Sequence, residues 1–255
     1  MNKKVWITGA SSGIGKALAI KFATEGWQIA ASARRENLLQ ELNKEYVNIH
    51  SFPVDVTDNE KVKIVFNDII SKLKNIDLCV FCSGIHDPKS ERKINIQSIR
   101  RIMEVNFFGT LNTINAAKDY FINKKSGHIS IVSSVASYRG LPAAAGYCAS
   151  KSALTSLAET LNFDLKKYNI RVSLVSPGFI KTPLTDQNNF PMPMIKSPEF
   201  AAEQMFIGLT KKSSFEIHFP KLFTYSLKIL RIIPYWLYFK ILSKGLKIII
   251  FLSLI

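Results

Sequence analysis

Two residues whose side chains could exchange protons, Tyr147 and Lys151, stand four positions apart in Tyr147-Cys-Ala-Ser-Lys151. On a helix, residues i and i+4 share a face, so the lysine ammonium would lie beside the phenol. A free tyrosine has a pKa near ~10, but a nearby positive charge favours the phenolate and lowers that pKa. Such a phenol can exchange a proton with a substrate hydroxyl or carbonyl. The pair alone also fits a helix surface with a solvated lysine, so the interpretation depends on the surrounding sequence.

A glycine-rich turn precedes the first predicted helix. It follows a strand-like run over 3–8 and opens an amphipathic run to about residue 25. The backbone N–H groups of such a turn and the positive end of the helix can hold a diphosphate. The spacing is G-x-x-x-G-x-G, and a plain strand-to-helix turn is the alternative. We therefore predict dinucleotide binding by Gly9, Ser11, Ser12, Gly13, Ile14 and Gly15.

Two arginines end the second predicted strand, 27–33. In a dinucleotide fold, this strand end meets the adenosine ribose, where an acid accepts from the 2′-hydroxyl and an arginine pairs with a 2′-phosphate. No acid stands at Ser32 or Ala33. The sequence therefore predicts a preference for NADP(H) over NAD(H), with Arg34 as the first contact and Arg35 as the second. The alternative is that both arginines lie in solvent at a strand end.

Strand-like and helix-like segments alternate along the chain, which predicts an α/β fold with a doubly wound parallel sheet, Rossmann-like. The later strands are predicted at 47–54, 76–82, 128–133, 170–175 and 215–219, and the later helices at 36–46, 59–72, 96–123, 147–167 and 198–211. Ligands bind beyond the carboxyl ends of such strands. The residues that follow the strands, and so share that edge, are Gly9–Gly15, Arg34, Asp55, Gly84, Ser134 and Pro177–Gly178.

Together these motifs resemble the classical short-chain dehydrogenase/reductase family over residues 3–219. The matching segments are Thr8–Gly15, Asp55-Val56, Asn106, Ser134, Tyr147, Lys151 and Pro177–Thr182, which includes Gly178 and Ile180. The resemblance implies that Asp55 and Val56 contact the adenine and that 177–182 holds the nicotinamide amide. It also implies a dimer or tetramer. One segment departs from the family pattern, because Phe81-Cys-Ser-Gly84 stands where Asn-Asn-Ala-Gly is usual.

The resemblance implies four catalytic residues. Ser134 would hold the substrate oxygen, Tyr147 would pass the proton, and Lys151 would bind the nicotinamide ribose and lower the pKa of Tyr147. Asn106 would anchor a water that leads the proton out. The implied reaction interconverts a carbonyl and a secondary alcohol. A second hypothesis is an NADPH-binding sensor or scaffold with vestigial catalysis, since fold does not fix function.

Composition excludes several classes of protein. The chain has 255 residues, of which 47% are hydrophobic and 21% charged, as is typical of a globular domain. Its three cysteines do not predict a disulfide framework, and Cys79 and Cys82 are predicted to be core residues on opposite faces of a strand. The histidines at 50, 86, 128 and 218 show no ligand or triad spacing. We expect no metal site and no secretory signal, and we expect a cytoplasmic protein.

The last part of the chain, 220–255, is predicted to be an apolar, basic helical tail on a catalytic domain of residues 1–219. Polar positions recur at Lys221, Thr224, Lys228 and Arg231, and later at Lys240, Lys244 and Lys247, and no acidic residue follows Glu216. This pattern favours an amphipathic segment on an anionic membrane surface, not nucleic acid. A cover over the substrate cleft or a subunit contact is the alternative. Either arrangement predicts a lipophilic substrate.

Overall fold

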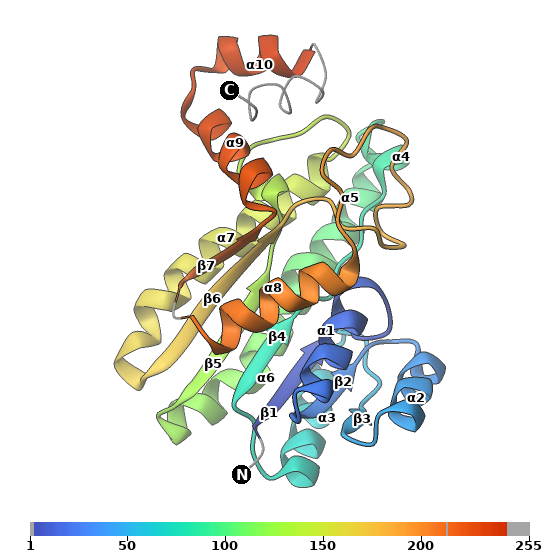
Figure 1. Ribbon diagram of the computed structural model, residues 1–255, viewed down its shortest axis with the longest axis vertical. Coiled ribbons are helices and arrows are strands. Elements are labelled where there is room, and N and C mark those ends of the chain that lie inside the picture. The colour runs from blue at the N-terminus through green and yellow to red at the C-terminus, as the bar shows by residue number, and fades with distance from the viewer. Residues whose placement is uncertain (1–2, 213, 244–255) are drawn as a thin grey trace.

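The computed structural model describes residues 3–212 and 214–243, and in it one parallel sheet organises the chain (Figure 1). The strand order is β3-β2-β1-β4-β5-β6-β7, and every neighbouring pair is parallel. The predicted doubly wound sheet is confirmed. The strands are β1 (Lys4–Thr8), β2 (Gln28–Ser32), β3 (Ile49–Ser51), β4 (Leu78–Phe81), β5 (Gly127–Val132), β6 (Ile170–Pro177) and β7 (Glu216–Phe219).

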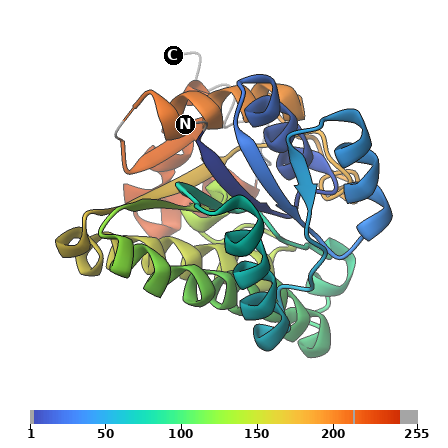
Figure 2. The same cartoon turned by 90° about the horizontal axis from the view of Figure 1, so that it is seen from below.

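Helices connect the strands and cover both faces of the sheet, as Figure 2 shows along the layers. They are α1 (Gly13–Thr24), α2 (Glu36–Glu45), α3 (Asn59–Leu73), α4 (Pro88–Glu91), α5 (Ile96–Met103), α6 (Gly109–Lys124), α7 (Ala145–Asp164), α8 (Pro198–Thr210), α9 (Lys221–Ile232) and α10 (Tyr235–Ser243). The predicted helix over 96–123 is helical throughout, but it consists of α5 and α6 joined by a π-helical turn at Glu104–Phe108. The short helix α4 was not predicted.

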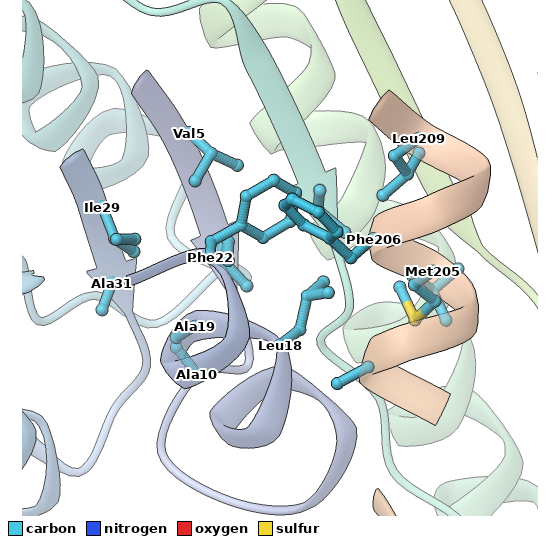
Figure 3. Close-up of a cluster of buried hydrophobic side chains, with 14 of the residues drawn as sticks. Val5, Ala10, Leu18, Ala19, Phe22, Ile29, Ala31, Met205, Phe206 and Leu209 are labelled. Carbon is cyan, nitrogen blue, oxygen red and sulfur yellow. The ribbon is translucent and has the colours of Figure 1, made fainter. Parts of the chain in front are cut away.

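Two apolar layers hold the helices on the sheet. One layer lies between β1 and β2, α1 and α8, where Phe22 and Phe206 pack edge to face with ring centroids 5.0 Å apart (Figure 3). The other lies under α3, α6 and α7. Cys79 and Cys82 belong to different layers, which confirms that they face opposite sides of β4. Because both layers are closely packed, the strand ends are rigid supports for a site.

The two C-terminal helices pack beyond the carboxyl end of β7 (Figure 1). Phe223, Leu227 and Leu230 on α9 are buried against Val135 and Tyr138, which follow β5. No helix within 3–212 and 214–243 is both long and apolar enough to cross a bilayer. The predicted basic positions Lys244 and Lys247 lie outside the described residues.

Candidate active site

One cleft of about 750 Å³ runs along the carboxyl edge of the sheet. Its walls come from the segments after β1, β2, β3, β4, β5 and β6, from the first turns of α1 and α7 and from α5. The sequence-predicted residues in its wall are Gly9, Ser11, Ser12, Gly13, Ile14, Gly15, Arg34, Arg35, Asp55, Val56, Gly84, Ser134, Tyr147, Lys151, Pro177, Gly178, Ile180 and Thr182. Asn106 is the exception, because it is fully buried behind the wall.

The turn over Gly9–Gly15 needs glycine at two positions, because a Cβ atom there would clash with neighbouring backbone atoms. Gly9 has φ +71°, and a Cβ there would lie 3.0 Å from the Cys82 carbonyl carbon. A Cβ on Gly15 would lie only 2.3 Å from the Gly9 carbonyl oxygen. Helix α1 begins at Gly13, so its first N–H groups point toward the cleft side of the turn. These features fit a bound diphosphate.

The two arginines after β2 have different surroundings. The Arg35 guanidinium donates to the Ser11 hydroxyl over 2.9 Å and to the Ser12 hydroxyl over 2.7 Å, so it lies across the glycine turn. The Arg34 guanidinium lies 3.8 Å from the Asp55 carboxylate, and both side chains are largely exposed. The order expected from the sequence placed Arg34 first, whereas Arg35 has the closer contact with the turn.

Asp55 is held by a local turn. Its carboxylate accepts hydrogen bonds from the Thr57 N–H at 3.0 Å and from the Thr57 hydroxyl at 2.8 Å. Such a turn is the common way for an aspartate to fix the backbone that follows it. The same turn keeps Asp55 and Val56 at the end of the cleft that Arg34 borders.

Ser134, Tyr147 and Lys151 meet on the other side of the cleft. Helix α7 begins at Ala145, two residues before the predicted start, so Tyr147 and Lys151 lie in its first turns and on one face. The Lys151 ammonium lies 5.7 Å from the centroid of the Tyr147 ring and donates to the Val132 carbonyl over 2.9 Å. Ser134 caps the short turn after β5, where its hydroxyl accepts from the Ala136 N–H.

The protonation equilibria of Tyr147 and Lys151 are set mainly by burial. Burial raises the pKa of Tyr147 to about 12, although the Ser134 hydroxyl acts in the opposite direction. Burial lowers the pKa of Lys151 to about 8. The pKa of Tyr147 is thus governed by desolvation of the phenolate, and the lowering expected from Lys151 is not seen in this structure.

Asn106 acts inside the wall of the cleft. It stands in the π-helical turn, and its side chain accepts from the Ile85 N–H at 2.7 Å and donates to the Ile85 carbonyl at 3.0 Å. It also donates to the Ser150 hydroxyl at 3.0 Å. Asn106 therefore ties the loop after β4 to α7, and it lies 3.4 Å from where a Cβ on Gly84 would be.

The unusual Phe81–Gly84 segment keeps its place without the asparagines. The Cys82 N–H donates to the Thr8 hydroxyl at the end of β1, over 3.1 Å. Cys82 and Gly84 both border the cleft, and Gly84 faces the Lys151 ammonium. The ends of β1 and β4 are thus joined by a hydrogen bond whose donor is the Cys82 backbone N–H and not an asparagine side chain.

The segment after β6 forms one wall of the cleft. The Gly178 N–H donates to the Phe219 carbonyl at 2.8 Å, and Ile180 forms a single bridge with Lys196. A Cβ on Gly178 would lie 2.9 Å from the Phe223 ring, so α9 packs directly against this segment. Thr182 meets the glycine turn, since its methyl group is 3.1 Å from where a Cβ on Gly13 would be.

One residue of the site was missed. No role was assigned to His86 from the sequence, but its ring lies against the Tyr147 ring with centroids 4.6 Å apart and an interplanar angle of 34°. Its partner is Glu91 on α4, at 3.2 Å. The spacing of the histidines carries no signal for this contact. The only available hint was the position of His86 two residues after Gly84, on the edge where the other site residues gather.

Comparisons with known proteins agree with this arrangement. Residues 3–191 match the sequence profile of the short chain dehydrogenases. The chain is 32% identical to an uncharacterized oxidoreductase of Myxococcus xanthus over 232 residues, covering 89% of this chain and 91% of the relative. It is 30% identical to the 3-oxoacyl-(acyl-carrier-protein) reductase FabG of Thermotoga maritima, covering 82% of this chain and 91% of the relative.

The fold is also similar to solved structures. A short-chain dehydrogenase from Streptomyces avermitilis superposes with a TM-score of 0.77 at 22% identity, covering 90% of this chain and 92% of the other. ElxO with NADP bound superposes with a TM-score of 0.75, also at 22% identity, covering 86% and 98%. At this identity the likeness extends to the fold.

Proposed function

The chain belongs to the short-chain dehydrogenase family, and from its site we propose an NADP(H)-dependent oxidoreductase that interconverts a carbonyl and a secondary alcohol, with Tyr147 as acid and base. That it is an oxidoreductase of this family follows from the sequence match and from the relatives. The observation that carries the proposal is the meeting of Ser134, Tyr147 and Lys151 in the same cleft as the glycine turn. A bound nicotinamide supplies the hydride for the carbonyl carbon.

The chain's own residues handle the substrate oxygen and the proton. In the reductive direction, the Ser134 hydroxyl donates to the carbonyl oxygen, and Tyr147 gives its phenolic proton to the same oxygen as the alcohol forms. At neutral pH Tyr147 is protonated and can donate this proton, although burial makes the phenol a weaker acid than a free tyrosine. Lys151 is then placed to bind ribose hydroxyls, and Asn106 to support the loop after β4.

The cofactor preference rests on Arg34 and Arg35. Both border the cleft next to the turn, and Ser32 and Ala33 supply no carboxylate for a ribose 2′-hydroxyl. Two guanidinium groups at this place suit a 2′-phosphate. The NADP-bound relative in fold, ElxO, is consistent with this assignment.

The substrate is proposed to be a lipophilic ketone or alcohol. Ile85, Ile102 and Leu184 border the cleft, and the apolar inner face of α9 packs beside it. Similarity to a 3-oxoacyl-(acyl-carrier-protein) reductase supports a keto group on an acyl chain. The proposal includes a homo-oligomer, as the family resemblance implied.

We also propose that α9 and α10 contact an anionic membrane. Their outer face, defined as Leu222, Tyr225, Ile229, Ile232, Tyr235, Trp236 and Phe239, is apolar and exposed, with Ile232 81% and Trp236 68% accessible. Lys221, Arg231 and Lys240 lie on the same helices, and no acidic residue follows Glu216. An apolar stripe with basic neighbours is the composition that binds anionic lipid surfaces.

Turnover assays test the chemistry. Purified protein is assayed with NADPH or NADH on long-chain 3-oxoacyl thioesters, simple ketones and small sugars. Tyr147→Phe is expected to reduce kcat about 10²–10⁴-fold and to keep NADPH binding. An unaltered kcat would refute the role of Tyr147, and turnover confined to small polar substrates would refute the lipophilic substrate. A biological effect that survives Tyr147→Phe would favour the sensor hypothesis.

Vesicle sedimentation tests the membrane contact. The full chain is expected to sediment with vesicles that contain phosphatidylglycerol, and less with pure phosphatidylcholine. Ile229→Ser and Trp236→Ser should release it, whereas Phe163→Ser, at a side chain 77% exposed on α7, should not. If the wild-type chain does not sediment with vesicles and the same outer-face variants dissociate an oligomer in detergent-free solution, the outer face is a subunit contact.

A further inference from the structure

His86 and Glu91 form a buried pair beside the catalytic tyrosine. His86 lies in the loop after β4, and Glu91 ends α4. The imidazole Nε2 is 3.2 Å from the Glu91 Oε1, and the two side chains are 8% and 0% exposed. Apart from this contact with each other, neither of the two atoms has a polar partner among the residues that the structure describes. Buried ionisable groups are costly unless they are paired, so each depends on the other.

Both members of the pair contact Tyr147. The second carboxylate oxygen of Glu91 accepts from the Tyr147 backbone N–H at 2.8 Å. This N–H is in the first turn of α7, where the donors have no partner within the helix and where a negative charge is favoured. The His86 ring covers the Tyr147 ring at 4.6 Å. One carboxylate therefore links the imidazole to the helix turn that carries the phenol.

We propose that His86 and Glu91 are positioning residues for Tyr147, which hold the phenol in the cleft and whose joint charge sets the pH range in which it exchanges its proton. The inference rests on the proposed role of Tyr147 as acid and base. A pair with net charge −1 opposes the phenolate, and a pair with net charge zero does not.

Other ionisable groups also face this region. Lys151 and Cys148 come from α7, Cys82 directly follows β4, and Asp87 adjoins His86. Burial raises the pKa values of Cys82 and Cys148 to about 11, so both thiols are neutral near pH 8. Lys151 and Asp87 remain the same in every variant described below. Differences among these variants therefore report the His86–Glu91 pair.

The comparison uses His86→Phe, Glu91→Gln and the double variant. His86→Phe keeps a ring against Tyr147 but leaves Glu91 as the one member of the pair that can carry a charge, so the local charge is −1. Glu91→Gln keeps an oxygen that can accept from the Tyr147 N–H, and the double variant is neutral. His50→Phe, at the far edge of the sheet, is the matched control.

The measured quantity is kcat/KM for alcohol oxidation between pH 6 and 10, where activity increases with pH because the deprotonated fraction of Tyr147 grows. The increase of kcat/KM with pH is expected to occur at higher pH in His86→Phe than in Glu91→Gln. At pH 8, kcat/KM of His86→Phe should therefore be about tenfold lower than that of Glu91→Gln. Adding Glu91→Gln to His86→Phe should restore the lost activity. A role in folding alone predicts no such restoration.

The inference is overturned if the three variants share one pH profile, or if the double variant is no better than His86→Phe. NADPH binding and thermal unfolding establish that each variant is folded. Should Glu91→Gln not fold, His86→Lys replaces it, because a permanent cation beside Glu91 must bring the rise to lower pH than in His86→Phe. Tyr147→Phe separates the two proposals: if it stays active, the proposed function fails, and if it is inactive while the profiles coincide, only this inference fails.

Discussion

The Lys151 ammonium donates a hydrogen bond to the Val132 carbonyl, 2.9 Å away, at the last residue of β5. Lys151 is only 4% exposed, so this carbonyl is its main compensation for lost water. The contact links helix α7 to the strand end that leads into Ser134. It also holds the lysine at the wall of the cleft.

The burial of Lys151 predicts a stability that depends on pH. Its pKa is about 8 in the folded chain and 10.5 for the free side chain, so between these values the unfolded chain binds more protons. Stability from this group is therefore lowest below pH 8 and increases up to about pH 10.5, by about 3 kcal/mol at most. Chemical unfolding of wild type and Lys151→Met at pH 7 to 10 measures it. The free energy of unfolding of wild type should increase relative to that of Lys151→Met as pH rises. A difference that stays constant with pH would contradict the lowered pKa of Lys151.

Much of the site could be predicted from sequence because strand ends of a parallel sheet share one edge. Gly9, Asp55, Gly84, Ser134 and Gly178 each follow a strand, and all of them border the cleft. His86 was missed because its partners, Glu91 and Tyr147, come from a short helix and from a residue about sixty positions later. No periodicity or spacing encodes such a tertiary contact.

The preference for NADPH over NADH is predicted to depend more on Arg35 than on Arg34. Arg35 is already fixed by Ser11 and Ser12, so less side-chain freedom is lost when it meets a phosphate. Arg35→Ala should weaken NADPH binding about 10- to 100-fold and leave NADH binding nearly unchanged. Arg34→Ala should have a smaller effect. Fluorescence titration with both cofactors measures this, and Arg100→Ala, at an exposed position on α5, is the control. Equal losses for NADH and NADPH would show that Arg35 does not select the phosphate.

The glycine turn should not tolerate even a methyl group at Gly15. Its Cβ would lie 2.3 Å from the Gly9 carbonyl oxygen, which is backbone and cannot move aside without shifting the turn. Gly15→Ala is expected to cost about 1–3 kcal/mol of stability and to weaken binding of both cofactors. Gly140→Ala, where no heavy atom lies within 4 Å of the added Cβ, is the control in the same unfolding and binding measurements. If Gly15→Ala binds cofactor like wild type, the turn does not approach the diphosphate closely.

The tail shows where sequence reasoning stopped. Its helical period predicted a one-faced helix, and α9 does bury one side. The pattern could not show that the buried side faces Val135 and Tyr138, because this depends on where β7 ends relative to β5. Nor could it show that Glu216, the last acidic residue, accepts from the Tyr138 hydroxyl at 2.6 Å and pairs with Lys228.

Arg139 is predicted to be the main attachment of the tail to the active-site loop. Its guanidinium donates to the Leu230 and Ile233 carbonyls over 2.5 and 2.9 Å. Its central carbon also lies 4.5 Å from the Tyr235 ring centroid and 4.2 Å from that of Tyr238. Carbonyls at a helix end have no partner within the helix, and a cation there is favourable. Arg139 stands five residues after Ser134, so its contacts join α9 and α10 to the catalytic side of the cleft.

Arg139→Ala should therefore loosen α9 and α10 before it affects the sheet. We expect a loss of about 2 kcal/mol in local stability, from hydrogen bonds to a charged donor and from two ring contacts. Hydrogen exchange followed by mass spectrometry should show faster exchange in 221–243 and unchanged exchange in α3. Arg139→Lys should restore only part of the protection, because an ammonium lacks the planar guanidinium that contacts both rings. Protection of 221–243 equal to that of wild type in Arg139→Ala would mean that the apolar contacts of Phe223, Leu227 and Leu230 hold the tail without it.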